Sequence, residues 1–290
     1  MPFSSLRPLC LLSILAVPAL LLGSVMPSRA QSTSKPSAKP ILFGWAKMTT
    51  EGVIIAGAYF PGVGWRREEV ARSFALPGTS WQVMNLSGKK VQFATDRAKP
   101  SNGPFGYFAE ARSTAKPNLE ASEGIALSAP HAKNAQPRVP RPQGLNNAQY
   151  VQAATKLLQT ATTTAKAKRL TQLLRVDLNG DGIEEVLMSA HSSPQYGRTP
   201  EIKVGDFDLT AIRFVHNGKV KTIAFTNEVA VKGSVFAAPN RTEFLACADI
   251  DGDGKMEIVL STGYYEGMGL EIWKFDGKDI TQVATAGWGA

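Results

Sequence analysis

Apolar residues occur along this chain in short stretches, which favours β-strands over long helices. Residues 52–60 are almost all apolar, which is typical of a buried strand. Apolar and polar side chains alternate over 81–93 on both sides of Ser87–Gly88, and this predicts a hairpin. A spacing of three and four runs from Tyr150 to Leu158 after the capping residue Asn147, and it predicts one amphipathic helix.

The C-terminal half repeats one succession of elements. Residues 170–176 and 244–248 each lead as a strand into an acidic turn, a second strand, an excursion, a third strand, a tight turn and a fourth strand. The tight turns contain Asn-Gly and Asp-Gly, which are the strongest short hairpin signals. The repetition predicts two antiparallel blade-like units, too few to close a β-propeller of roughly four to eight blades.

We therefore expect a mainly β protein with two domains. Residues 144–290 should form a C-terminal antiparallel β domain of two blade-like repeats with one packing helix. Residues 41–108 should form a small β-rich N-terminal domain. Between them, the five prolines of residues 109–143 predict a linker without regular structure, and residues 31–40 read as a flexible tether.

Residues 1–30 have the order of a secretory signal peptide. Arg7 precedes an apolar run, and Ser28-Arg29-Ala30 places small residues at −3 and −1 of a cleavage site. We predict cleavage after Ala30, a secreted or periplasmic location, and no integral membrane segment after signal cleavage. The mature chain would keep one cysteine, Cys247, and so no intramolecular disulfide; its apolar neighbours predict a buried thiol.

Charge is unevenly distributed along the chain. Residues 31–170 carry 19 lysines and arginines against 7 acidic residues, whereas residues 171–290 carry 11 against 17. The basic half contains no dense basic run and no nucleic-acid motif, so no nucleic-acid partner is expected. Attraction to anionic envelope polymers or lipid surfaces and a merely solvated basic face are both open interpretations.

Oxygen-bearing side chains recur at fixed positions of the two acidic turns. In residues 177–185 (loop one) and 249–257 (loop two) they stand at positions 1, 3, 5 and 9, with glycine at position 6. The predicted ligands are Asp177, Asn179, Asp181 and Glu185 in loop one, Asp249, Asp251, Asp253 and Glu257 in loop two, and the backbone carbonyls of Ile183 and Lys255. Ca²⁺ takes about six to eight oxygen ligands, so the pattern predicts two Ca²⁺ sites. The alternative is a pair of hairpin turns with solvated carboxylates.

Position 12 separates these loops from the EF-hand. It is Met188 or Leu260, where an EF-hand needs a bidentate glutamate, and each loop runs into an apolar, β-branched strand. The loops resemble instead the D-x-[DN]-x-D-G-x-x-[DE] loop of FG-GAP/VCBS-type repeats, which lies between two strands of a β unit. The resemblance implies structural calcium and an adhesion or ligand-binding role towards an extracellular or envelope ligand, a protein or a glycan.

Formal charge predicts a difference between the two loops. The side-chain ligands of loop one carry −3 and those of loop two carry −4, since Asp251 replaces Asn179. Ligand charge tunes calcium affinity, so loop two should bind the ion more tightly.

Catalytic patterns are missing from the sequence. The mature histidines are His131, His191 and His216, and no nucleophile elbow, zinc spacing or phosphate-binding glycine loop accompanies them. We predict a non-enzymatic protein. The alternative is an envelope-associated hydrolase, or an accessory module of one, with its site in the N-terminal domain and calcium purely structural.

Overall fold

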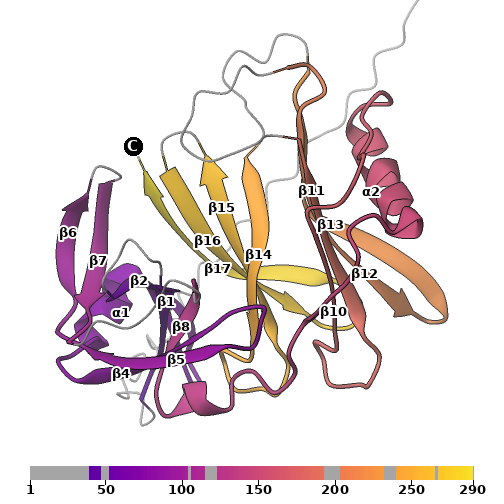
Figure 1. The fold of residues 1–290 in the computed structure, drawn as a ribbon. Coiled ribbons are helices and arrows are strands. Elements are labelled where there is room, and N and C mark those ends of the chain that lie inside the picture. Colours follow the sequence, from indigo (N-terminus) through magenta and orange to yellow (C-terminus); the bar gives the residue numbers. More distant parts are fainter. Residues whose placement is uncertain are drawn as a thin grey trace, which may run out of the picture. The chain divides into compact units, whose positions relative to one another are not determined.

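The computed structural model describes residues 39–46, 52–103, 106–114, 123–192, 203–231, 240–264 and 267–289. These residues form three antiparallel sheets, one longer helix and three short helical turns (Figure 1). The expected mainly β fold class is confirmed. The predicted signal peptide lies outside the described residues. Within the described ranges, no helix has the length and apolar character needed to cross a bilayer.

The first sheet is built from the N-terminal part of the chain, in the order β5-β4-β8-β1-β2-β7-β6 with β3 paired to β2. Its elements are β1 (Ile41–Ala46), β2 (Gly52–Phe60), β3 (Gly64–Arg67), α1 (Glu68–Ala71), η1 (Arg72–Phe74), β4 (Thr79–Met84), β5 (Lys90–Thr95), β6 (Lys99–Gly103), β7 (Gly106–Arg112) and β8 (Gly124–Ser128). Phe43 and Trp45 of β1 enter one hydrophobic cluster, and Leu42 and Ala46 enter another on the opposite face. Burial on both faces explains the continuous apolar runs.

The expected boundary at residue 108 and the linker over 109–143 are wrong. Strand β7 crosses the boundary, and β8 lies between β4 and β1 inside the first sheet. Further along, η2 (His131–Lys133) is a short helical turn and β9 (Arg141–Pro142) pairs with a C-terminal strand. Prolines exclude helix but are tolerated at strand ends and sheet edges, so their number concealed the short apolar strand β8.

Each C-terminal repeat forms a four-stranded antiparallel sheet, as the repeated pattern predicts. Repeat one comprises β10 (Gln172–Val176), β11 (Glu185–His191), β12 (Phe207–His216) and β13 (Lys219–Val229), with β9 added beside β10. Repeat two comprises β14 (Arg241–Ala248), β15 (Glu257–Tyr264), β16 (Gly267–Phe275) and β17 (Ile280–Gly289). The turn between β12 and β13 has Asn217 at φ 51° and Gly218 at φ 70°, the left-handed backbone that a two-residue hairpin requires.

The predicted helix is α2 (Ala148–Ala161), and it packs on repeat one. Asn147 Oδ1 accepts the Gln149 N–H at 3.1 Å and caps its first turn. Ala154 and Leu158 are buried against apolar residues of β10, β11 and β12. The helix therefore covers one face of the sheet of repeat one.

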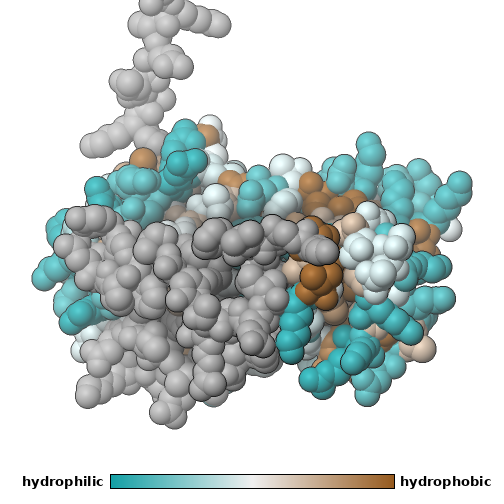
Figure 2. Space-filling view, turned by 90° about the horizontal axis from the view of Figure 1, so that it is seen from above, coloured by the Kyte–Doolittle hydropathy of each residue, from teal (hydrophilic) through white to brown (hydrophobic). Residues whose placement is uncertain are grey.

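The sheet of repeat two is the middle layer of the three. Phe244, Cys247 and Ile258 face repeat one, whereas Ala246, Val259 and Trp288 join the cluster of Phe43 and Trp45 from the first sheet. Figure 1 shows the yellow strands of repeat two between the purple first sheet and repeat one. In the view of Figure 2, the described surface is mostly hydrophilic, and the largest group of hydrophobic residues lies beside the residues drawn in grey, with smaller groups elsewhere. Because the layers share continuous cores, the sheets form one unit rather than two domains joined by a linker.

Candidate metal centre

The two acidic loops contact each other directly. Loop one joins β10 to β11 and loop two joins β14 to β15. The Met256 N–H at the end of loop two donates to Leu178 O of loop one at 2.8 Å. The repeated pattern predicted the two loops, and the packing of the sheets brings them together.

Position 1 of each loop holds the same tight turn. Asp177 accepts the N–H groups of Gly180 at 2.7 Å and Gly182 at 3.1 Å, and Asp249 accepts those of Gly252 at 2.7 Å and Gly254 at 3.0 Å. All four glycines have φ between 78° and 85°. A left-handed backbone costs other residues about 1–2 kcal/mol, which explains glycine at positions 4 and 6.

The remaining predicted ligands follow one hydrogen-bond pattern in both loops. In loop one, Asn179 Oδ1 accepts the Asp181 N–H and Asp181 Oδ1 accepts the Ile183 N–H, at 3.1 and 2.7 Å. In loop two, Asp251 Oδ1 and Asp253 Oδ1 accept the N–H groups of Asp253 and Lys255, at 3.3 and 2.9 Å. One oxygen of each of these side chains thus shapes the loop.

The glutamate at position 9 closes each loop onto the strand that follows. Glu185 Oε2 accepts the Leu178 N–H at 2.9 Å, and Glu257 Oε2 accepts the Ile250 N–H at 2.7 Å. Burial raises the pKa of Glu185 to about 7, and burial together with the neighbouring Asp251 carboxylate raises the pKa of Glu257 to about 8. Both glutamates are buried acids whose charge calls for a cation.

The carboxylates of loop two converge on one point. One oxygen each of Asp249, Asp251 and Glu257 lies within 4.8 Å of the others. Glu257 is only 1% exposed, and its Oε1 has no hydrogen-bond partner within the described structure. An all-oxygen set with an unpaired buried carboxylate oxygen suits a hard cation such as Ca²⁺, so the side chains present fit the predicted ion.

A lysine from outside the loop faces the same oxygens. Lys274 Nζ of β16 donates to Asp251 Oδ2 and to Asp253 Oδ2, the latter at 2.9 Å, and lies 3.7 Å from Glu257 Oε1. Burial opposes the charge of the ammonium group, but the bonds to Asp251 and Asp253 outweigh burial and raise the pKa of Lys274. Nothing in the spacing of the loop residues pointed to Lys274.

Loop one has a different electrostatic environment. In the ranges that the structure describes, no lysine or arginine nitrogen lies within 4.0 Å of the carboxylates of Asp177, Asp181 or Glu185. At position 3, where loop two has the carboxylate of Asp251, loop one has the amide of Asn179. Its Nδ2 donates to Asp181 Oδ2 at 3.0 Å. Within the described residues, the carboxylates of loop one therefore form no ion pair, and they do not converge within 4.8 Å of one another as those of loop two do.

An arginine from the expected linker joins the two loops. Arg138 Nε donates to Asp177 O at 2.5 Å, and its Nη2 donates to Leu178 O at 3.1 Å and to Gly254 O at 3.0 Å. The segment before it also contacts loop two, since Ala135 O accepts the Asp249 N–H and the His131 ring lies 2.6 Å from Asp249 O. Sequence reasoning missed these residues because a lone arginine between prolines carries no metal-site signal.

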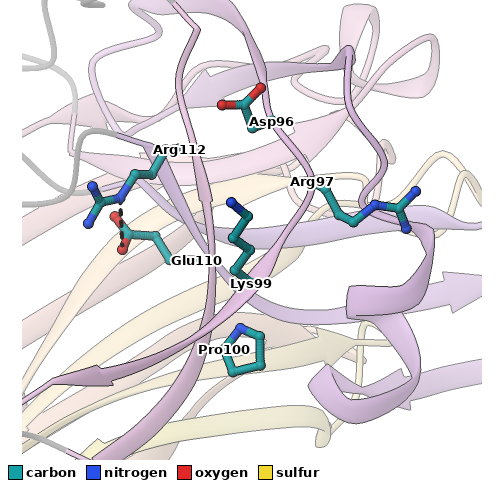
Figure 3. Close-up of a pocket in the computed structure, with 6 residues that line it drawn as sticks. All are labelled: Asp96, Arg97, Lys99, Pro100, Glu110 and Arg112. Atoms are coloured by element: carbon teal, nitrogen blue, oxygen red, sulfur yellow. Dashed lines mark ion pairs between the residues drawn. The ribbon is translucent and has the colours of Figure 1, made fainter.

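Two hollows of the described surface lie away from the loops. One, of about 240 Å³, is lined by Asp96, Arg97, Lys99, Pro100, Glu110 and Arg112. Figure 3 shows the Glu110–Arg112 ion pair on one side of it and Lys99 beside the pair. The other, of about 180 Å³, lies where Trp65, Arg66 and Arg67 meet β17. Neither lining contains a histidine, and Thr285 in the second provides the one hydroxyl side chain of the two linings.

The three histidines each contact groups of the fold. His131 and His216 lie within hydrogen-bond distance of backbone carbonyls, those of Asp249 and Gly277. His191 Nδ1 lies 3.2 Å from Thr171 Oγ1, and burial lowers the pKa of His191. The prediction of a non-enzymatic protein is unchanged by this arrangement.

No protein-family model, no curated protein and no solved structure matches the chain. The likeness to FG-GAP/VCBS-type repeats therefore rests on the two loop motifs and stays a prediction.

Proposed function

We propose that this chain is a secreted or periplasmic, non-enzymatic calcium-binding protein in which the ion stabilises the junction of two β repeats. The observation that carries the proposal is the common hydrogen-bond pattern of the two loops. In both, one oxygen of the glutamate holds the loop, and in loop two the other oxygen, Glu257 Oε1, has no hydrogen-bond partner within the described structure. A pair of solvated hairpin turns would have no reason to bury both glutamates.

The position of the loops supports a structural role for the ion. Glu185 and Glu257 begin β11 and β15, so a bound cation would connect each loop to the strand after it. It would also offset the repulsion among the clustered carboxylates. Because Arg138 bonds to both loops, order in the loops is coupled to the segment that leaves the first sheet.

The role beyond stability is proposed from the loop resemblance. It implies adhesion or ligand binding, with an extracellular or envelope partner that is a protein or a glycan. No observation favours the hydrolase alternative over this role.

The test is the calcium dependence of thermal unfolding of the purified protein. Extracellular calcium modules bind at about 10⁻⁴–10⁻³ M, so about 10 mM Ca²⁺ should be compared with EDTA and with Mg²⁺. Calcium at about 100 times its Kd stabilises by about 2.7 kcal/mol, which should raise the Tm by roughly 5–10 °C. The Asp181→Ala/Asp253→Ala double variant is the matched control and should lose the response. Equal Tm values in calcium and EDTA would contradict the proposal.

A further inference from the structure

Loop two already contains a positive charge, the ammonium group of Lys274. Lys274 lies in β16 opposite Thr281 and reaches the loop from the neighbouring strand. Its Nζ bonds to Asp251 and Asp253 and lies 3.7 Å from Glu257 Oε1. An ammonium group offers three donor hydrogens, and three carboxylates surround this one.

Glu257 shows why the cluster needs this charge. Its side chain is nine-tenths or more buried, and Oε1 faces the ammonium group without any hydrogen bond of its own in the described structure. A buried carboxylate is costly unless a positive charge or a donor compensates it. This oxygen is independent of the backbone turns that shape the loop, and it marks the centre of a cation site.

Repeat one has an aromatic residue where repeat two has Lys274. The pairs Val186–Arg213 and Ile258–Trp273 occupy equivalent places in the two sheets, so Lys274 corresponds to Phe214. Phe214 is buried and packs edge-on against Phe275, with ring centroids 4.8 Å apart. The repeats thus share their loops but not the strand residue that reaches the loop.

We infer that Lys274 is the resident cation of loop two, so that calcium binds loop one and enters loop two only when the ammonium group has left. This inference rests on the proposed calcium function and assigns different occupants to the two loops. Calcium would bond to the carboxylate oxygens at about 2.3–2.6 Å, and the ammonium group contacts the same atoms, so one excludes the other. The order of affinity expected from ligand charge alone is thereby reversed.

The main experiment counts calcium sites by isothermal titration calorimetry on the full protein. The wild type should show one site, and Asp181→Asn should remove it. Lys274→Met removes the ammonium group and keeps an unbranched apolar side chain, so it should add a second site, at least about 100-fold tighter than any loop-two binding by the wild type. Asp253→Asn, added to Lys274→Met, should abolish this second site. Lys278→Met, a change at an exposed lysine in the next turn, is the matched control and should leave one site.

The outcomes separate the two proposals. Two sites in the wild type, with loop-two binding unchanged by Lys274→Met, would overturn the assignment of Lys274. A site that is present in Lys274→Met but missing from the wild type would support that assignment and contradict calcium binding at loop one. No calcium binding by either protein would contradict both proposals.

A second measurement needs no substitution. Acetylation of lysines in the wild type, followed by mass spectrometry, compares Lys274 with Lys278. Lys274 should react at least about tenfold more slowly than Lys278, because its ammonium group is partly buried and held by Asp251 and Asp253, whereas Lys278 is exposed. About 1 mM calcium should leave this ratio unchanged. Acceleration of Lys274 by calcium to the rate of Lys278 would mean that the ion displaces it, and would overturn the inference.

Discussion

Loop one and loop two have the same backbone and different surroundings. In both, the aspartate at position 1 accepts two glycine N–H groups, and the glutamate at position 9 accepts the N–H of the residue at position 2 of the loop. Loop two also receives an ammonium group from β16, whereas loop one has an amide at position 3 and no such cation within the described residues. The comparison teaches that a loop motif determines which oxygens are offered, and the neighbouring strand determines what can occupy them.

The largest expected difference between the repeats is the protection of a thiol. Cys247 and Arg175 both stand two residues before their loop, but Cys247 is fully buried and burial raises its pKa to about 12. The thiolate is the reactive form, so native Cys247 should be labelled about 1,000-fold more slowly than an accessible thiol. The reference is Arg175→Cys in a Cys247→Ala background, with Cys10 replaced in both proteins. The two rates should agree in denaturant, and rapid native labelling of Cys247 would break the comparison.

Next in size is a pH effect that should be confined to repeat one. Asp208 of β12 lies opposite His191 of β11 in the sheet of repeat one. The equivalent strand pair in repeat two is Met268 opposite Gly263, which contains no acid. Asp208 is buried, and burial raises its pKa from 3.8 to about 7, although both its oxygens accept the Thr242 N–H. A raised pKa in the folded protein means that the carboxyl stabilises the fold below about pH 4, and that this stabilisation disappears as the pH rises to about 7.

Asp208→Asn removes this titration. Between pH 4 and pH 8 the wild type should lose on the order of 4 kcal/mol of unfolding free energy relative to the variant. Urea unfolding in EDTA at five pH values measures the difference. A difference that does not vary with pH would show that Asp208 has no raised pKa.

The connection between the two loops should depend on Arg138, in the segment 109–143 that was expected to be a linker, and not on the nearby Arg141. Arg138 donates three hydrogen bonds to carbonyls of both loops, whereas the exposed Arg141 pairs with Glu184 at the surface. Arg138→Met should lower the free energy of unfolding by about 2–3 kcal/mol, because the partly buried carbonyls of Asp177 and Leu178 lose a charged donor. Arg138→Lys should recover part of the loss, since a single ammonium cannot reproduce the planar fork.

Arg141→Met is the matched control, and it should cost only a small fraction of the Arg138 effect because surface ion pairs are weak. The measurement is the free energy of chemical unfolding, in calcium, of the wild type and of the variants Arg138→Met, Arg138→Lys and Arg141→Met. Equal losses for Arg138→Met and Arg141→Met would mean that Arg138 does not join the loops.

The smallest effect concerns the two hairpin turns. Gly218 and Gly277 both have positive φ, 70° and 88°, so alanine at either should cost about 1 kcal/mol. A methyl group at Gly218 would meet open space, whereas one at Gly277 would lie 3.4 Å from Asn179 Nδ2 of loop one. Because 3.4 Å is an ordinary van der Waals distance, both variants should lose similar stability and leave calcium binding at loop one unchanged. Thermal unfolding and calcium titration of both variants measure this, and a clearly weaker calcium affinity of Gly277→Ala alone would contradict it.

Much of the fold could be predicted because its signals are local. The hairpin at Asn217–Gly218, the cap at Asn147 and the glycines of the loops each meet a backbone requirement of their own residues. The repeated order of strands and loops followed from alternation and turn chemistry. These determine the mainly β class, the two four-stranded units and the oxygen set of each loop.

Other features came only from contacts between residues far apart in the chain. The insertion of β8 into the first sheet, the core that joins Trp45 to Trp288 and the bridge from Arg138 all depend on which strands lie side by side. The reversed order expected for the two calcium loops has the same origin. Ligand charge can be counted along 249–257, but Lys274 reaches those carboxylates because β16 pairs with β15, and loop spacing does not encode that contact. The sequence by itself determined the donor oxygens, and the tertiary structure decided which positive charge they meet.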